Sequence, residues 1–79
     1  MAKYTILGIH VQNRKKHVGS IQKVLTKHGH EIKTRLGIHH SDDESPTGLI
    51  ILEIKPSSFK AISDDLKKIE GIELKSMKF

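Results

Sequence analysis

The 79-residue sequence contains no cysteine and no tryptophan, and it has only one tyrosine and two phenylalanines. The absence of cysteine excludes disulfide frameworks, thiolate metal sites and cysteine nucleophiles. No apolar run approaches the roughly 18 residues of a membrane span, and the N-terminus lacks the apolar core of a signal peptide. We therefore expect a cytoplasmic protein without a membrane association.

The small number of apolar residues limits the size of the core. Residues 1–79 are long enough for a single domain, because a second core would have too little apolar surface to bury. Hydrophobic residues make up 35% of the chain. Small domains of this kind often gain burial by associating with copies of themselves. We therefore expect a homodimer or a homotetramer.

Hydrophobic periodicity divides the chain into four strands and two helices. The predicted strands cover residues 3–12, 32–38, 48–54 and 72–79. The first helix is predicted to begin after Asn13, as N-cap, and to end at Gly29, as a left-handed C-cap residue. The second helix is predicted to begin at Pro56 and to end at Gly71.

The pattern of apolar residues also predicts which faces are buried. The alternation that includes Leu36 and Ile38 predicts a strand with one buried and one exposed face. The strand at residues 48–54 is apolar on both faces, which suggests that a second subunit covers it. In the second helix, Asp64 and Asp65 are expected opposite the apolar stripe.

The order of these elements predicts the fold class. Strand-helix-strand-strand-helix-strand is the split βαβ arrangement of an α+β, ferredoxin-like βαββαβ domain. We expect a four-stranded antiparallel sheet in the order 4-1-3-2, with both helices on one face. The surplus apolar residues on the other face should be covered by a sister chain.

Charge is distributed unevenly along the chain, whose net charge is +5. Residues 1–40 carry eight lysines or arginines against Glu31, whereas residues 41–79 carry six lysines against eight acids. Such asymmetry can attract nucleic acid or an anionic ligand, or it can simply form a solvated face. Nucleic acid is therefore a possible but not the favoured partner.

The six histidines raise the question of a metal site. His39 and His40 are adjacent, so on a strand they would lie on opposite faces and at most one could join a given site. His28 and His30 flank the glycine at the predicted helix end. A metal sensor using His28, His30 or His39 is an alternative, but we predict no metal site and no cofactor.

The residues do not support catalysis. No arrangement suggests an activated nucleophile, and the acids at positions 42–44 are expected at an exposed loop tip, where their protonation is hard to tune. The basic run that begins at Asn13 precedes a helix N-terminus and could bind an anion. We therefore predict no enzyme activity and place the candidate ligand-binding residues here: Asn13, Arg14, Lys16 and His17.

Three segments carry a resemblance to a known family. Residues 13–32, 35–38 and 69–76 are similar to the first loop, helix end and closing strands of ACT domains. The whole chain resembles the stand-alone ACT-like proteins described as proposed regulators of the iron-only hydrogenase system, related in fold to the regulatory domain of the nickel-responsive repressor. The resemblance implies a homo-oligomeric, ligand-responsive regulatory module, in transcription or a related process. It does not carry over the repressor's nickel ligands or its DNA-binding domain, which this sequence lacks.

The resemblance and the residues together give one favoured hypothesis. A small effector would bind near the first strand-helix loop, at a subunit interface. The alternatives are a basic protein associated with nucleic acid and the metal sensor described above.

Overall fold

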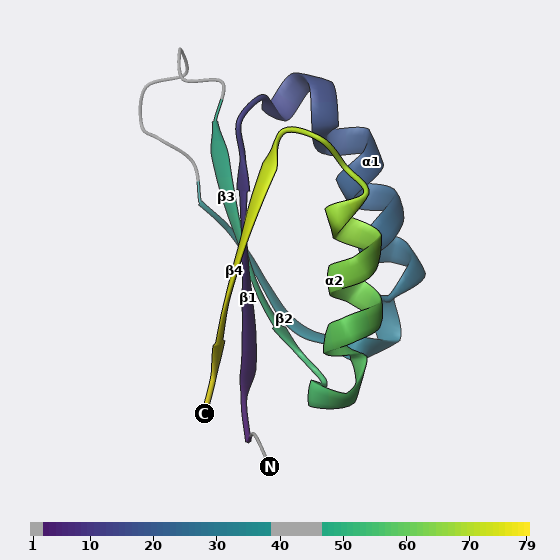
Figure 1. The fold of residues 1–79 in the computed structure, drawn as a ribbon, viewed down its shortest axis with the longest axis vertical. Coiled ribbons are helices and arrows are strands. Elements are labelled where there is room, and N and C mark those ends of the chain that lie inside the picture. The colour runs from purple at the N-terminus through teal and green to yellow at the C-terminus, as the bar shows by residue number, and fades with distance from the viewer. Residues whose placement is uncertain (1–2, 39–46) are drawn as a thin grey trace.

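A four-stranded sheet and two α-helices make up the part of the chain that the computed structural model describes, residues 3–38 and 47–79 (Figure 1). The elements follow in the order β1 (Thr5–Val11), α1 (Arg14–Lys27), the 3-10 turn η1 (Gly29–Glu31), β2 (Ile32–Ile38), β3 (Gly48–Ile54), the 3-10 turn η2 (Pro56–Ser58), α2 (Phe59–Lys67) and β4 (Ile72–Lys78). The antiparallel strands lie in the order β2-β3-β1-β4. Read from the other edge, this is the predicted order 4-1-3-2, so the ferredoxin-like fold is confirmed.

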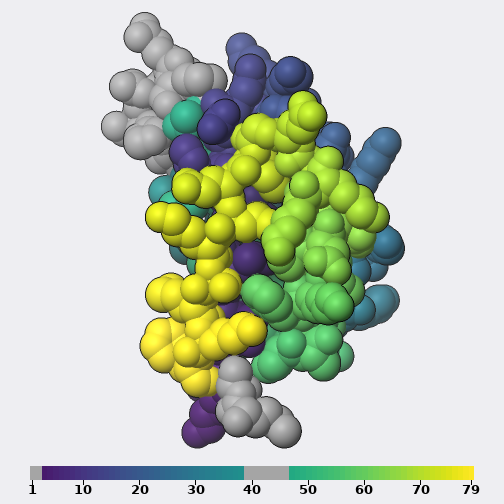
Figure 2. Space-filling view, in the orientation of Figure 1, coloured from purple at the N-terminus to yellow at the C-terminus, as the bar shows by residue number. Residues whose placement is uncertain are grey.

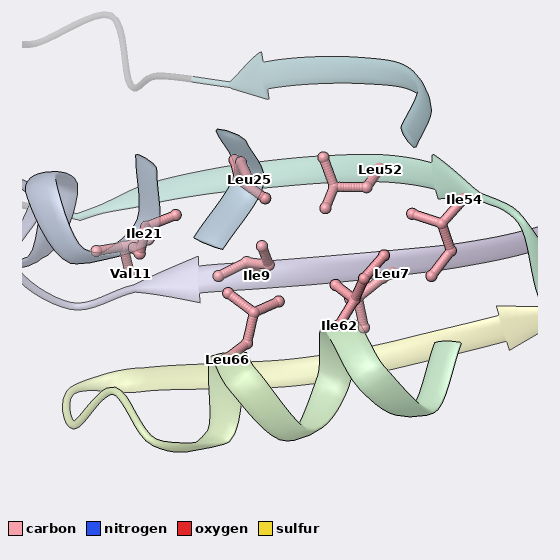
Figure 3. Close-up of a cluster of buried hydrophobic side chains, with 9 residues drawn as sticks. All are labelled: Leu7, Ile9, Val11, Ile21, Leu25, Leu52, Ile54, Ile62 and Leu66. Carbon is pink, nitrogen blue, oxygen red and sulfur yellow. The ribbon is translucent and has the colours of Figure 1, made fainter. Parts of the chain in front are cut away.

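The core lies between one face of the sheet and the two helices (Figure 3). Successive side chains of a strand lie on opposite faces, so alternate residues of β1 and β3 reach the helices. Nine aliphatic side chains are at most 3% exposed and form this core: Leu7, Ile9, Val11, Ile21, Leu25, Leu52, Ile54, Ile62 and Leu66. Burying each one stabilises the fold by about 1.5–3 kcal/mol before chain entropy is counted.

Each helix contributes to the core through residues four positions apart. Ile21 and Leu25 lie on one face of α1, and Ile62 and Leu66 lie on one face of α2. Both helices lie on the same side of the sheet, and α2 lies beside β4 (Figures 1 and 2). Within the described residues, no helix is long and apolar enough to cross a membrane.

The end of the first helix differs from the prediction. Gly71 is the only described residue with a positive φ, 79°, so Gly29 is not a left-handed C-cap residue. Helix α1 ends at Lys27, His28 is its C-cap with a φ of −102°, and Gly29 opens η1. The chain turns instead through η1, in which the backbone N–H of Glu31 donates a hydrogen bond of 2.9 Å to the carbonyl oxygen of His28.

The burial of β2 also differs from the prediction. Every residue from Lys33 to Ile38 is exposed, with Leu36 at 54% and Ile38 at 45%. A register shift between Ile32 and Thr34 pairs Leu36 with Ile51, on the face of the sheet away from the helices. The alternation in the sequence is real, but a bulge turns its apolar side outward. The acids at positions 42–44, predicted to lie at a loop tip, are outside the described residues.

Gly71 provides a test of the turn between α2 and β4. We expect Gly71→Ala to lower the free energy of unfolding by about 1–2 kcal/mol, because a left-handed conformation costs a residue with a Cβ that much. The new Cβ would also lie 2.5 Å from His17 Nε2. Urea unfolding followed by circular dichroism measures the change.

The matched control is Gly19→Ala in the middle of α1, where an added Cβ meets no atom within 4 Å. This variant should gain about 0.5–1 kcal/mol, because alanine favours the helix. Equal stability of the Gly71→Ala variant and the wild type would contradict the assigned turn.

Candidate functional site

The loop between β1 and α1 holds the predicted ligand-binding residues, and Asn13 has a structural role in it. Asn13 is extended, and its Oδ1 accepts a hydrogen bond of 3.2 Å from the backbone N–H of Lys16. This is an N-cap, as predicted, and it satisfies one of the free N–H groups at the helix start. The amide nitrogen of Asn13 is still a donor for a ligand.

Arg14 and His17 pack against glycines of other elements. A Cβ on Gly48 would lie 2.7 Å from Arg14 Cδ, and a Cβ on Gly71 would lie 2.5 Å from His17 Nε2. The backbone N–H of Gln12 also donates a hydrogen bond of 3.1 Å to the carbonyl oxygen of Gly71. The start of α1, the start of β3 and the turn before β4 therefore meet at one end of the sheet, opposite the chain ends (Figure 1).

The first turn of α1 is electropositive. Arg14, Lys15 and Lys16 lie in this turn, which contains no acidic residue. The N-terminal end of a helix already carries a partial positive charge, so cations there are unfavourable and an anion is favoured. Lys16 is exposed and His17 is half-buried, so the loop presents charge to solvent.

The face of the sheet away from the helices is hollowed along β1, β3 and β4. An open trough of about 590 Å³ lies over Gly8, whose missing side chain leaves the hollow. Four apolar side chains line it, Ile6, Leu49, Ile51 and Met77, together with Lys75 and Ser76 of β4. This volume lies in the range of about 300–1,000 Å³ that is typical of small-molecule sites.

One end of the trough is polar. His10 Nδ1 lies 3.8 Å from Glu73 Oε1, and both side chains are about half exposed. His10 precedes the last residue of β1, so this end of the trough is next to the β1–α1 loop. Further exposed apolar residues lie on the same face because Leu36 pairs with Ile51, and Ile38 pairs with Leu49.

A second cluster of charged side chains surrounds His28, which is only 7% exposed. His28 Nδ1 lies 2.9 Å from Glu31 Oε2, and His28 Nε2 lies 2.8 Å from Asp65 Oδ2. Ionised carboxylates only accept hydrogen bonds, so the site favours the imidazolium form of His28, in which both ring nitrogens donate. The cluster joins the end of α1, the turn η1 and the helix α2.

The pKa values of this cluster follow from its geometry. The hydrogen bond to Asp65 is the largest cause that raises the pKa of His28 above its usual 6.5, against the opposing effect of burial. The hydrogen bond from His28, followed by that from Lys27, lowers the pKa of Asp65 to about 2. The hydrogen bond from His28 likewise lowers the pKa of Glu31.

Sequence reasoning missed this cluster and misplaced Asp65. The prediction set Asp65 on the exposed side of α2, but its side chain is 20% exposed and bound to His28. The contact joins residues 37 positions apart, so no local pattern indicates it. The spacing of His28 and Glu31, three residues apart, was the only signal available, because residues at that spacing share a helical face.

The histidines considered as metal ligands do not converge in the described part of the chain. Both nitrogens of His28 are bound to carboxylates, and His30 is exposed. His39 lies outside the described residues, as do His40 and the acids at 42–44. Among residues 3–38 and 47–79, no group of three or more histidine or acidic side chains is placed to hold a metal ion.

Comparison with known proteins confirms the resemblance found in the sequence. A family model named TM1266-like, with the description "Iron-only hydrogenase system regulator, putative", matches residues 3–76. No curated protein matches the chain. The description names a regulatory role and no enzyme activity.

Solved structures show the same fold. Protein TM1266 from Thermotoga maritima is 23% identical, with a TM-score of 0.77 over 100% of this chain and 99% of that chain. The ACT domain of a GTP pyrophosphokinase from Chlorobium tepidum is 15% identical, with a TM-score of 0.68 over 94% of this chain and 84% of that chain. A formyltetrahydrofolate deformylase from Pseudomonas putida KT2440 is 13% identical, with a TM-score of 0.59. That match covers 95% of this chain but only 28% of the deformylase. The fold is therefore ACT-like, and the similarity to the deformylase involves only a part of that enzyme.

The His28 cluster predicts how stability depends on pH. Because the pKa of His28 is raised, the contribution of His28 to stability is complete below pH 6.5 and is lost as the pH rises through the raised pKa. The pKa values of Glu31 and Asp65 are lowered, so the contribution of these carboxylates to stability is complete above pH 4.5 and is lost as the pH falls toward 2. The Tm should therefore be highest between these two limits.

Thermal unfolding across this pH range tests the assignment with two variants. His28→Gln should flatten the fall of Tm above pH 6.5, because no titrating group then lies between the carboxylates. His30→Gln, at an exposed site in the same turn, should keep the wild-type profile. A profile that His28→Gln leaves unchanged would disprove the coupling.

Proposed function

This chain belongs to the TM1266-like family of iron-only hydrogenase system regulators and has an ACT-like fold, and we propose that it acts as a homo-oligomeric regulatory module. The module binds a small effector beside the β1–α1 loop, at an interface between subunits. The observation that carries this proposal is the apolar face of the sheet on the side away from both helices.

This face supports self-association. Leu36, Ile38 and Met77 are 54%, 45% and 57% exposed. Met77 lines the trough over Gly8, and Leu36 and Ile38 pair with two other residues that line it. Contiguous exposed apolar surface on a small protein marks an interaction site more often than scattered exposed residues do. A second copy seated on this face would bury these side chains, and each would contribute up to about 1.5–3 kcal/mol.

The β1–α1 loop supports an effector site for three reasons. Its basic side chains and the positive end of α1 favour an anionic group. Arg14 and His17 are held in place by close packing against Gly48 and Gly71. The polar end of the trough, at His10 and Glu73, is next to this loop, so a sister chain on the sheet face would reach it.

A ligand in this position would control assembly. A molecule that contacts two subunits at once stabilises the oligomer by mass action, by an amount that grows with its concentration. The change in assembly is then the signal that a partner responds to. In this reading Asn13, Arg14, Lys16 and His17 supply the polar contacts, and no residue has to perform chemistry.

Light scattering tests the oligomer. At micromolar concentration the wild-type protein should have a multiple of the 8.9 kDa subunit mass. Leu36→Glu, which places a charge on the proposed interface, should shift the mass toward a single subunit. Val18→Glu is the matched control, because Val18 is 50% exposed and lies on the helix side of the molecule. A wild-type protein that is purely monomeric would remove the interface from the proposal.

Native mass spectrometry tests the effector site. Protein purified without chelator or added ligand should retain a small molecule, and Lys16→Ala should lose it, because an exposed cation of the loop is gone. Lys23→Ala, also exposed but two turns further along α1, should retain it. Retention by both variants would exclude the loop as the site.

A further inference from the structure

The solvent side of α1 carries charge of one sign. All five charged residues of this helix are basic: Arg14, Lys15, Lys16, Lys23 and Lys27. The four lysines are exposed. Lys16, Lys23 and Lys27 follow one another at intervals of seven and four residues, which places them in one row along the helix. At a rise of 1.5 Å per residue, this row is about 16 Å long.

The row continues onto the next helix. Lys27 Nζ lies 3.1 Å from Asp65 Oδ2, and Lys68 Nζ lies 3.8 Å from Asp65 Oδ1, so both lysines flank one carboxylate. They are 68% and 79% exposed, whereas Asp65 is 20% exposed and already bound to His28. We define the basic helix surface by these residues: Lys15, Lys16, Lys23, Lys27 and Lys68.

The fold does not require this arrangement. In the described part of the chain, no carboxylate forms an ion pair with Lys15, Lys16 or Lys23. Like charges four residues apart, as in Lys23 and Lys27, destabilise a helix by about 0.2–0.5 kcal/mol. Cations in the first turn also oppose the helix dipole. Lys15, Lys16 and Lys23 therefore form a costly local pattern with no ion pair to offset it, which indicates a function.

We propose that the basic helix surface binds the phosphate backbone of double-stranded nucleic acid without reading its sequence. A row of about 16 Å matches about five base pairs at 3.4 Å each. The surface contains no aromatic side chain on which bases of a single strand could stack. It also lacks the wide apolar face that an interfacial membrane helix needs, since Val18 is its sole exposed large aliphatic residue.

This surface is on the opposite side of the molecule from the apolar sheet face, so the inference does not depend on the proposed oligomer. It shares only Lys16 with the proposed effector site. The two proposals can therefore fail separately, and the variants below leave the loop residues unchanged.

Fluorescence anisotropy with a labelled DNA duplex of mixed sequence tests the inference on the full chain. Binding at low salt should weaken steeply as salt is added, and three or four phosphate contacts predict a log-log slope of about −3 to −4. Neutralising Lys23 and Lys68 together, by Lys23→Gln and Lys68→Gln, should make this slope shallower by about two and weaken binding at least about tenfold.

The control removes the same amount of charge elsewhere, by Lys3→Gln next to β1 and Lys33→Gln on β2, two exposed positions outside both helices. It should bind almost like the wild type. Light scattering of all variants keeps any loss of assembly distinct from a loss of binding. Absence of binding at low salt, equal losses in both double variants, tighter binding of single-stranded DNA, or equal binding of poly-glutamate would each overturn the inference.

Discussion

Burial on one side of a single sheet is the constraint on which the rest of this structure depends. Nine aliphatic side chains between the sheet and two helices form the core, and two helices are too few to cover both faces. Many of the residues that remain on the other face are nevertheless apolar, around a hollow over Gly8. Fold and proposed function therefore have the same origin, because the surface that the helices leave open is the one that we propose a second chain covers.

The two sides of the molecule have different chemistry. The sheet side is largely apolar, with His10, Glu73 and Lys75 as its charged side chains along the trough, and the helix side is polar and rich in lysine. The β1–α1 loop lies at the boundary between them, where its residues pack against Gly48 and Gly71. Association through one side, a ligand at the boundary and a polyanion on the other side would not compete for the same residues, apart from Lys16.

The sequence allowed the topology to be predicted because period-two and helical patterns are local. The range of β3 and the Asn13 cap were correct for this reason. Gly71 does form the turn before β4, but the second helix spans Phe59–Lys67 and not Pro56 to Gly71, because Pro56–Ser58 form a separate 3-10 turn. The errors involved contacts between distant residues. The burial of Asp65 depends on His28, 37 positions away. The exposure of Leu36 depends on a bulge against β3, and an alternating sequence does not indicate which side its apolar residues face.

The ends of the described chain form adjacent strands. Phe79 exchanges backbone hydrogen bonds with Tyr4, at 2.9 Å and 3.1 Å, next to the pair of Thr5 and Lys78. Both ends lie far from the β1–α1 loop (Figure 1). A short peptide could therefore join them without crossing the sheet, and the chain could be reopened elsewhere. A circularly permuted protein would therefore keep the elements around the β1–α1 loop in their present spatial arrangement.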